Sequence, residues 1–288
     1  MSSPEAQTAD GPMAIVAAEQ FEERPLIRDP CAYRFLTGGA RWFAAANRWG
    51  PLRRWTIRSM EKRMPGLWAN IVCRKRYVDD RLLEAAESGV DAVVILGAGF
   101  DDRAYRLAAL EGTPVFEVDL PENADRKRAA LHRVYGAVPA SVTLVPVDFQ
   151  TQALADVLAE HGYRPEWRTF FVWEAVTQYL TEEGVRATFG FLAAAPAGSR
   201  LAFTYVHRDF LDGTDAFGAG AAYEKWVVRE RIWRFGMRPE EVGGFLAEYG
   251  WRELDQAGEE EFAARYVAPT GRALRTTDVE RSVAAEKA

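Results

Sequence analysis

One stretch, DAVVILGAGFDDRAYRL at Asp91–Leu107, constrains the fold of this chain more than any other. Its run of four large apolar residues, VVIL, is typical of a strand buried on both faces, because the run is β-branched and too short for a helix. Gly97, Ala98 and Gly99 follow directly, and the apolar residues after them recur with helical spacing. A strand, a glycine turn and a helix in this order indicate a crevice in which backbone N–H groups can approach a ligand.

Two positions around this turn indicate the class of ligand. A dinucleotide-binding turn needs a third glycine at position 102, where the helix packs closely on the strand. This chain has Asp102 there, beside Asp101, and two carboxylates disfavour a pyrophosphate. A second expected strand at 114–118 ends at Asp119, which is placed to bind a ribose diol. The glycine pattern alone also occurs in turns that bind nothing, but the combination predicts a nucleoside ligand without phosphates, namely S-adenosylmethionine.

Strands and helices alternate along the middle of the chain. Runs typical of buried strands occur at 93–96, 114–118, 141–147, 169–174 and 200–206, and helical patterns follow or separate them. This alternation predicts a doubly wound, mostly parallel α/β sheet with right-handed crossovers. Two further expected strands, at 251–255 and 281–285, bring the sheet to seven strands.

The remaining segments suggest how the domain is covered. We expect a disordered tail at 1–12, a helical and unusually aromatic segment at 13–70, and the ligand-binding domain at 71–288, with an insert at 207–240. The aromatic residues of 13–70 fit either an ordinary helical core or a lid over the crevice. Ligands of such sheets lie at the carboxyl ends of the strands, so we expect this segment and the insert to cover that edge.

Acidic residues follow three successive strands, at Asp119, Asp148 and Glu174. A strand that ends at the surface commonly has an acid there, but three at one edge favour a role in ligand binding. Asp148 is placed to accept a hydrogen bond from the adenine amino group, with Phe149 against the ring. Glu174 is placed to face the positive charge of the methionine moiety.

The carboxylate of that moiety needs an arginine, which can bind it through two parallel hydrogen bonds. The cluster of Arg74, Lys75 and Arg76 lies just before the central strand and is the nearest source, although such a cluster is also typical of a solvated helix face. The residues alone leave open which member of the cluster binds the ligand.

The stretches VVILGAGFDDRAYRL, VFEVDLP, VPVDF and WEAVTQYL, preceded by the arginine, resemble the leucine carboxyl methyltransferase family from about residue 73 to 206. That family includes protein-phosphatase methyltransferases and many actinobacterial small-molecule carboxyl methyltransferases, and the resemblance implies S-adenosylmethionine-dependent O-methyl transfer. It implies that Arg74 binds the methionine carboxylate and that Tyr179 lies where the acceptor approaches. The family usually has Gly where this chain has Ala175, and Thr where it has Asp102, so we expect a changed loop shape. The residues expected at the cofactor are Arg74, Gly97, Ala98, Gly99, Asp102, Asp119, Leu120, Asp148, Phe149 and Glu174.

The acceptor atom depends on the need for a base. A carboxylate is ionised at neutral pH and needs none, whereas a hydroxyl does. His207, next to the fifth strand, is the candidate base, although it also fits an ordinary surface-loop histidine. We predict a methyl ester of a small natural-product-type molecule. The alternatives are a base-assisted hydroxyl methyltransferase, an NAD-type oxidoreductase and a catalytically silent cofactor-binding protein.

Charge and composition limit the partners. The net charge is −6, yet nine Arg or Lys residues and one acid, Glu61, fall within 47–76. This balance argues against nucleic-acid binding and allows one basic patch that faces an anionic or aromatic small molecule. A homodimer is compatible with the sequence. The three histidines and two cysteines have no metal-ligand spacing, so we expect no metal.

The cellular compartment is predicted from the lack of membrane and secretion signals and from the small number of cysteines. No apolar run approaches the roughly 20 residues that span a bilayer, and the first residues lack the pattern of a secretory signal. Cys31 and Cys73 are too few for a disulfide scaffold. We therefore expect a cytoplasmic protein without a membrane partner.

Overall fold

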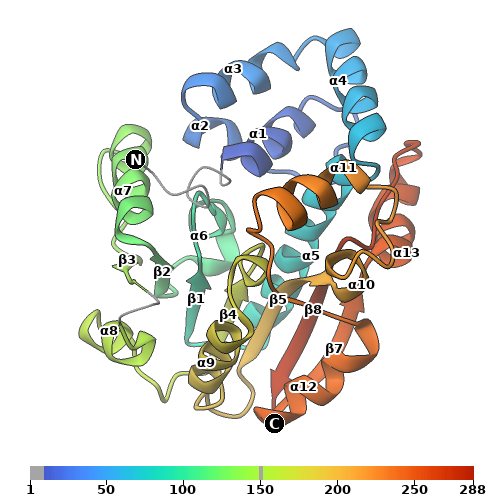
Figure 1. The fold of residues 1–288 in the computed structure, drawn as a ribbon. Coiled ribbons are helices and arrows are strands. Elements are labelled where there is room, and N and C mark those ends of the chain that lie inside the picture. Colours follow the sequence, from blue (N-terminus) through green and yellow to red (C-terminus); the bar gives the residue numbers. More distant parts are fainter. Residues whose placement is uncertain (1–9, 149–151) are drawn as a thin grey trace.

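The fold is a twisted central sheet with helices on both faces, seen in a computed structural model that describes residues 10–148 and 152–288 (Figure 1). The strands run in the order β3-β2-β1-β4-β5-β8-β7, and a short strand, β6, pairs with β5. Their bounds are β1 Ala92–Leu96, β2 Val115–Asp119, β3 Val142–Pro146, β4 Thr169–Trp173, β5 Arg200–His207, β6 Gly236–Met237, β7 Trp251–Ala257 and β8 Glu280–Lys287. The expected seven-stranded, mostly parallel sheet is confirmed, with β6 added from the insert.

The register explains why the strand ends share one edge. β1 pairs in parallel with β2 and β4, and β2 and β4 pair in parallel with β3 and β5. β8 is antiparallel to both β5 and β7. Every residue of β1, β2 and β4 is buried, as a parallel sheet covered on both faces requires. Asp119 and Glu174, at the ends of β2 and β4, therefore lie on either side of the glycine turn after β1.

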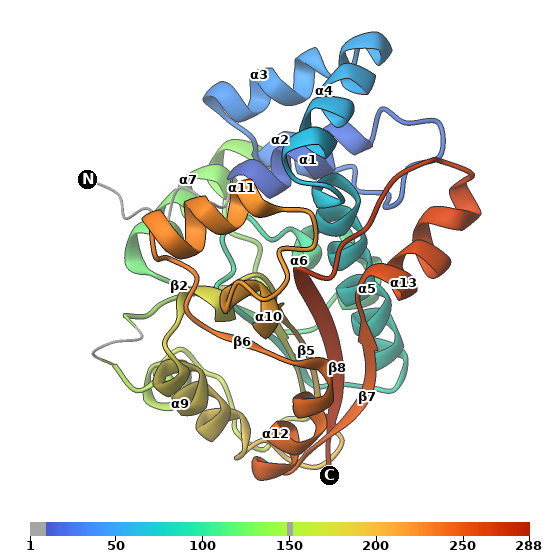
Figure 2. The same ribbon diagram turned by 45° about the vertical axis from the view of Figure 1, so that its right-hand side comes forward.

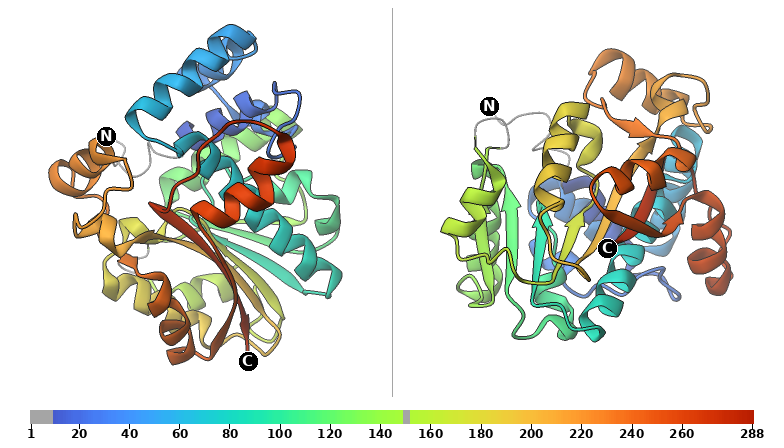
Figure 3. Two further views of the ribbon diagram at one scale, coloured as in Figure 1. Left: turned by 90° about the vertical axis from the view of Figure 1, so that its right-hand side faces the viewer. Right: turned by 90° about the horizontal axis from the view of Figure 1, so that it is seen from below.

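Two layers of helices bury the two faces of the sheet (Figure 3). The long helix α5 packs on one face together with α7 and α13, and α8, α9 and α12 pack on the other. Thr181 caps α9 by accepting a hydrogen bond from the Gly184 N–H at 3.2 Å, as its position before two glutamates predicts. The bounds are α5 Leu67–Glu87, α7 Pro121–Tyr135, α8 Leu154–Glu160, α9 Glu182–Leu192, α12 Val242–Glu248 and α13 Glu259–Phe262.

The helix expected after β1 is much shorter than its spacing suggested. Helix α6 spans only Arg103–Arg106, because Leu107 takes an extended conformation with φ −90° and ψ 105°. A single turn of 3-10 helix then leads to Leu110. The helix before β1, α5, begins at Leu67, so Arg74 lies inside this helix.

The N-terminal segment forms a layer of four helices beside the strand ends (Figures 1 and 2). Its aromatic residues divide between the two interpretations: Phe35 and Trp68 are buried, whereas Trp42, Trp49 and Trp55 are 78, 67 and 65% exposed. The first helix begins at Asp10, inside the expected tail at 1–12, and residues 1–9 lie outside the described part of the chain. The bounds are α1 Asp10–Glu19, α2 Ala32–Phe35, α3 Gly38–Ala46 and α4 Gly50–Arg63.

The insert after β5 meets this N-terminal layer. It contains the short helices α10 Arg208–Leu211 and α11 Gly220–Ala222, and Figure 2 shows α11 near α1 and α10 near β5 and β6. Met64 packs against the apolar cluster of the insert, and a side-chain carbon at Gly218 would lie 3.4 Å from Pro65. Within the part of the chain that the structure describes, no helix is both long and apolar enough to span a bilayer.

Candidate functional site

The glycine turn between β1 and α6 is held tightly against the neighbouring strands. The N–H groups of Gly97 and Ala98 both donate to the carbonyl oxygen of Val118, at 2.8 and 3.0 Å. Gly97 has φ +69° and Gly99 has φ +44°, a region that L side chains rarely adopt. A side-chain carbon at Gly97 would also lie 2.3 Å from a methyl group of Val176, so the loop after β4 packs directly on the turn.

Asp119 is tied to this turn. Its carboxylate accepts hydrogen bonds from the N–H of Gly99 at 2.6 Å, from the N–H of Leu120 at 2.7 Å and from the side-chain amide of Asn123 at 2.8 Å. The residue is 8% exposed. An ionised carboxylate has about four acceptor positions, so Asp119 retains capacity for a ligand hydroxyl.

Asp148 lies at the next strand end. The β2–β3 register pairs Asp119 with Pro146, and the Val147 N–H donates to the Asp119 carbonyl oxygen at 2.8 Å. Asp148 is half-buried, and its backbone N–H donates to the side chain of Gln152 at 2.9 Å. Phe149, the expected partner of the adenine ring, lies outside the described residues.

Arg74 and Glu174 lie in one buried network. The Arg74 Nε donates to Glu174 at 2.9 Å, and its Nη1 donates to Glu280. The Arg103 Nη2 donates to the other oxygen of Glu174 at 2.6 Å. Burial raises the pKa of the Glu174 carboxyl, but Arg103 and Arg74 outweigh it and lower the pKa to about 2. Glu174 is therefore firmly ionised between two guanidinium groups.

The backbone directly after Glu174 adopts a conformation that favours glycine. Ala175 has φ +59°, in the left-handed region that favours glycine. The Ala175 N–H donates to the Thr204 hydroxyl oxygen at 2.8 Å, and this hydroxyl donates to Glu280 at 2.8 Å. The left-handed conformation at Ala175 is thus held by hydrogen bonds that lead to β5 and β8.

Asp102 does not face the crevice, contrary to its expected contact with the cofactor. Its side chain is fully buried, and it accepts hydrogen bonds from Lys75 at 2.8 Å and Arg106 at 2.8 Å. Burial would raise the pKa of Asp102, but these two cations hold it well below its ordinary value. Lys75 also pairs with Asp29 at 2.5 Å. Asp102 therefore anchors the turn to α5, and its charge is neutralised inside the protein.

The two expected acceptor-side residues lie on adjacent segments. Tyr179 is half-buried in a 3-10 turn at Thr177–Tyr179, and the Thr177 hydroxyl donates to the Thr204 carbonyl oxygen at 2.6 Å. His207 ends β5, with a side chain 12% exposed. Its Nδ1 accepts a hydrogen bond from the Asp209 N–H at 3.2 Å, and its ring packs on Phe217.

The family model for leucine carboxyl methyltransferases matches residues 9–193, most of the chain. The chain belongs to this family. Proteins of similar sequence bear the family-level name of S-adenosyl-L-methionine-dependent methyltransferase. One, from Streptomyces avermitilis, is 33% identical over 265 residues, or 91% of this chain and 88% of the relative. Another, from Frankia alni, is 33% identical over 248 residues, or 85% and 82% of the two chains.

Solved structures agree on the fold. A DUF574 family protein from Streptomyces avermitilis has a TM-score of 0.61 at 15% identity and covers 83% of this chain and 91% of that one. A protein from Thermobifida fusca has a TM-score of 0.61 at 14% identity, and the match covers 99% of this chain and 97% of that one. The expectation of an S-adenosylmethionine-dependent methyltransferase is confirmed by the family, which also argues against the NAD-type oxidoreductase.

Sequence reasoning missed several residues of the network. Arg103 is 1% exposed and pairs with Asp79 at 2.7 Å, with Asp101 and with Glu174. Glu280 reaches Arg74 from the first residue of β8. Arg103 stood in the quoted glycine-turn motif, but nothing in the pattern marked it as buried. Across residues 10–148 and 152–288, no group of three His, Cys, Asp or Glu side chains is arranged to hold a metal ion.

Proposed function

We propose that this methyltransferase transfers the methyl group of S-adenosylmethionine to a carboxylate oxygen of a small anionic molecule, giving a methyl ester. The observation that carries this proposal is the state of His207, the candidate base for a hydroxyl acceptor. Its Nδ1 accepts a backbone hydrogen bond, so the proton of the neutral ring sits on Nε2. In that tautomer Nε2 is a donor and cannot take a proton from a hydroxyl, whereas a carboxylate needs no base.

The crevice residues fit the bound cofactor, which supplies a methyl group on a positively charged sulfur. The absence of a side chain at Gly97, where Val176 closes the turn, suits the close approach of the methionine moiety. Arg74 and Glu174 present opposite charges to that zwitterionic moiety. Asp119 suits the ribose hydroxyls, and Asp148 the adenine amino group.

The protein's contribution to rate is then mainly positional. Fixed near-attack geometry contributes on the order of 7–11 kcal/mol to such displacements. We assign this positioning to Tyr179 and propose that the segments 13–70 and 207–240 cover the site as lid and insert. The Arg234 N–H of the insert donates to the Gln178 carbonyl oxygen at 2.7 Å, beside Tyr179. The basic stretch 47–76 suits an anionic acceptor, and the buried free thiols of Cys31 and Cys73 suit the cytoplasm.

The experiment that tests this proposal identifies the bond formed. The protein is incubated with methyl-labelled S-adenosylmethionine and a panel of small carboxylic acids and phenols, and the labelled product is treated with mild alkali. We expect labelled methanol, because an ester hydrolyses and an ether does not. An alkali-stable product would contradict the proposal in favour of a hydroxyl methyltransferase. Cofactor binding without any labelled product from the panel or from extracts would favour a catalytically silent protein.

A further inference from the structure

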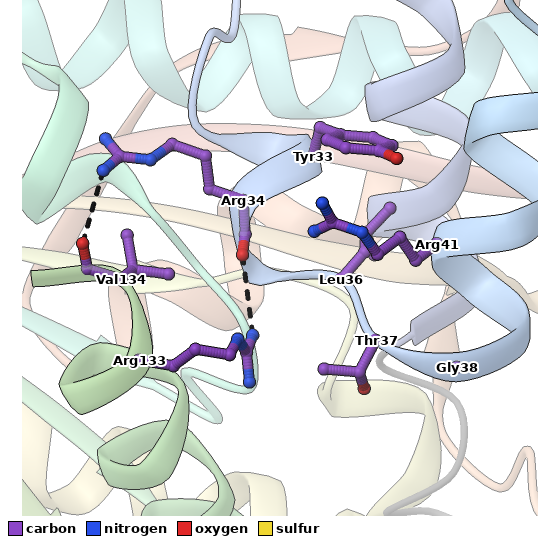
Figure 4. Close-up of a pocket in the computed structure, with 8 residues that line it drawn as sticks. All are labelled: Tyr33, Arg34, Leu36, Thr37, Gly38, Arg41, Arg133 and Val134. Atoms are coloured by element: carbon purple, nitrogen blue, oxygen red, sulfur yellow. Dashed lines mark hydrogen bonds between the residues drawn. The ribbon is translucent and has the colours of Figure 1, made fainter.

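An open hollow of about 590 Å³ lies between α2, α3 and the carboxyl end of α7 (Figure 4). Its volume lies within the range of sites that hold small organic molecules. Three of the lining side chains are arginines, and none is acidic. The lining residues are Tyr33, Arg34, Leu36, Thr37, Gly38, Arg41, Arg133 and Val134.

The three guanidinium groups have no acidic partner among the described residues. Arg41 lies over the Tyr33 ring with 4.5 Å to its centre. Arg133 donates only to backbone carbonyl oxygens, with 3.0 Å to that of Phe35, and Arg34 donates to the Val134 carbonyl oxygen at 3.4 Å. In a chain with a net charge of −6, three such cations around one hollow leave a local excess of positive charge. Arginine presents donors in a fork that matches a phosphate or carboxylate group.

The remaining lining supports an organic anion. Figure 4 shows Arg41 on the α3 side of the hollow and Arg133 on the α7 side, with Leu36 and Thr37 between them. Tyr33 and Leu36 offer apolar surface for the body of a ligand, and Tyr33 already stacks with a guanidinium. The amino end of α3, at Gly38, adds the favourable end of the helix dipole.

The hollow is separate from the cofactor crevice. Asn123, which donates to Asp119, and Arg133 both lie on α7, ten residues apart in the sequence. Ten residues of α-helix rise about 15 Å. The lining also contains none of the residues to which we assign the cofactor, and neither Tyr179 nor His207.

We propose that this hollow binds a small molecule through its phosphate group. A phosphate monoester has a charge of about −1.5 to −2 at neutral pH, which matches three guanidinium groups better than the single charge of a carboxylate. The site is a second ligand site of the methyltransferase, outside its catalytic crevice.

The test is calorimetric titration of the full chain, saturated with S-adenosylhomocysteine, with phenyl phosphate, inorganic phosphate and benzoate at constant ionic strength. We expect phenyl phosphate to bind one-to-one with a Kd below about 1 mM, and benzoate at least about 10-fold more weakly. If phenyl phosphate binds more tightly than inorganic phosphate, the natural ligand is an organic phosphate ester. If the two bind equally, the natural ligand is free phosphate. Either result supports a phosphate-binding site in the hollow.

The decisive variant is Arg41→Gln, because within residues 10–148 and 152–288 the Arg41 guanidinium has no charged partner and lies over the Tyr33 ring, so its loss should leave the fold intact. We expect about 10-fold weaker binding or more, and the same for Arg34→Gln. The matched control is Arg58→Gln, which removes an exposed arginine of α4 outside the hollow and should change the affinity less than about twofold. Absence of phenyl phosphate binding, equal losses in the control, or benzoate binding as tight as phenyl phosphate would overturn the proposal. Displacement of S-adenosylhomocysteine by phenyl phosphate would overturn it as well.

Discussion

Replacing Glu174 with glutamine removes a carboxylate that two buried guanidinium groups share, at 2.9 Å from Arg74 and 2.6 Å from Arg103. The Glu174 side chain is 14% exposed, so solvent screens these contacts only weakly. Its pKa falls from the ordinary 4.5 to about 2 in the folded protein. At about 1.4 kcal/mol per pKa unit, the ionised carboxylate contributes roughly 3 kcal/mol to the free energy of unfolding.

The direction of the pKa shift of Glu174 determines how its contribution to the free energy of unfolding depends on pH. Because the pKa of Glu174 is lower in the folded protein than in the unfolded chain, the contribution is complete above about pH 5 and is lost as the pH falls toward 2. We therefore expect Glu174→Gln to lower the free energy of unfolding by roughly 3 kcal/mol at pH 7. At pH 3 the difference between the two proteins should fall to about half, because Glu174 is then mostly protonated in the unfolded chain but still mostly ionised in the folded protein.

The assay is urea unfolding of the cofactor-free protein at several pH values between 7 and 3. Glu182→Gln is the matched control, since the Glu182 side chain is 60% exposed and pairs with the exposed Arg186. That variant should change stability by less than about 1 kcal/mol. Equal stability of Glu174→Gln and wild type at pH 7, or a difference that does not shrink in acid, would refute the reasoning.

Three further predictions concern the loop after β4, the cofactor and the acceptor. Ala175→Gly should raise the free energy of unfolding by about 0.5–1 kcal/mol, because glycine adopts the left-handed backbone conformation without strain. The control Ala130→Gly, within α7, should lower the free energy of unfolding by a similar amount. If denaturant unfolding shows that both variants are less stable than wild type, this prediction is contradicted. Arg74→Ala should weaken S-adenosylhomocysteine binding by about 1.5–3 kcal/mol in a titration, and Arg76→Ala, which removes a side chain 43% exposed, should do less; the reverse order would count against the assignment. His207→Ala should retain most of the methyl-transfer rate, which should be nearly flat from pH 6 to 8, and a loss of about 100-fold would point to a base-assisted hydroxyl acceptor.

The parallel half of the sheet could be predicted because its signals are local. The apolar runs of β1, β2 and β4 are short, rich in large or β-branched residues and buried on both faces. The acids at positions 119, 148 and 174 each follow a strand. Because strands that alternate with helices run parallel through right-handed crossovers, these strands end at the same edge of the sheet, and the three acids could be predicted to lie there.

The ion-pair network could not be predicted in the same way. Glu280 lies 206 residues after Arg74, and they meet only because β8 enters the sheet beside β5. An apolar run shows that a strand exists, but it does not specify which strand is its neighbour. Arg103 and Arg106 resemble exposed helix residues in the sequence, and their burial depends on Asp79 of α5.

The measurement that tests the account most directly is a calorimetric titration of wild type and Asp119→Asn with S-adenosylhomocysteine and NAD. Asp119 joins the glycine turn to the end of β2, and asparagine keeps its size while removing the charge that would bind the ribose. We predict one-to-one binding of S-adenosylhomocysteine to wild type, at least about 10-fold weaker binding to the variant, and no binding of NAD. Unchanged affinity in Asp119→Asn, or NAD affinity without affinity for S-adenosylhomocysteine, would contradict the placement of the cofactor in this crevice.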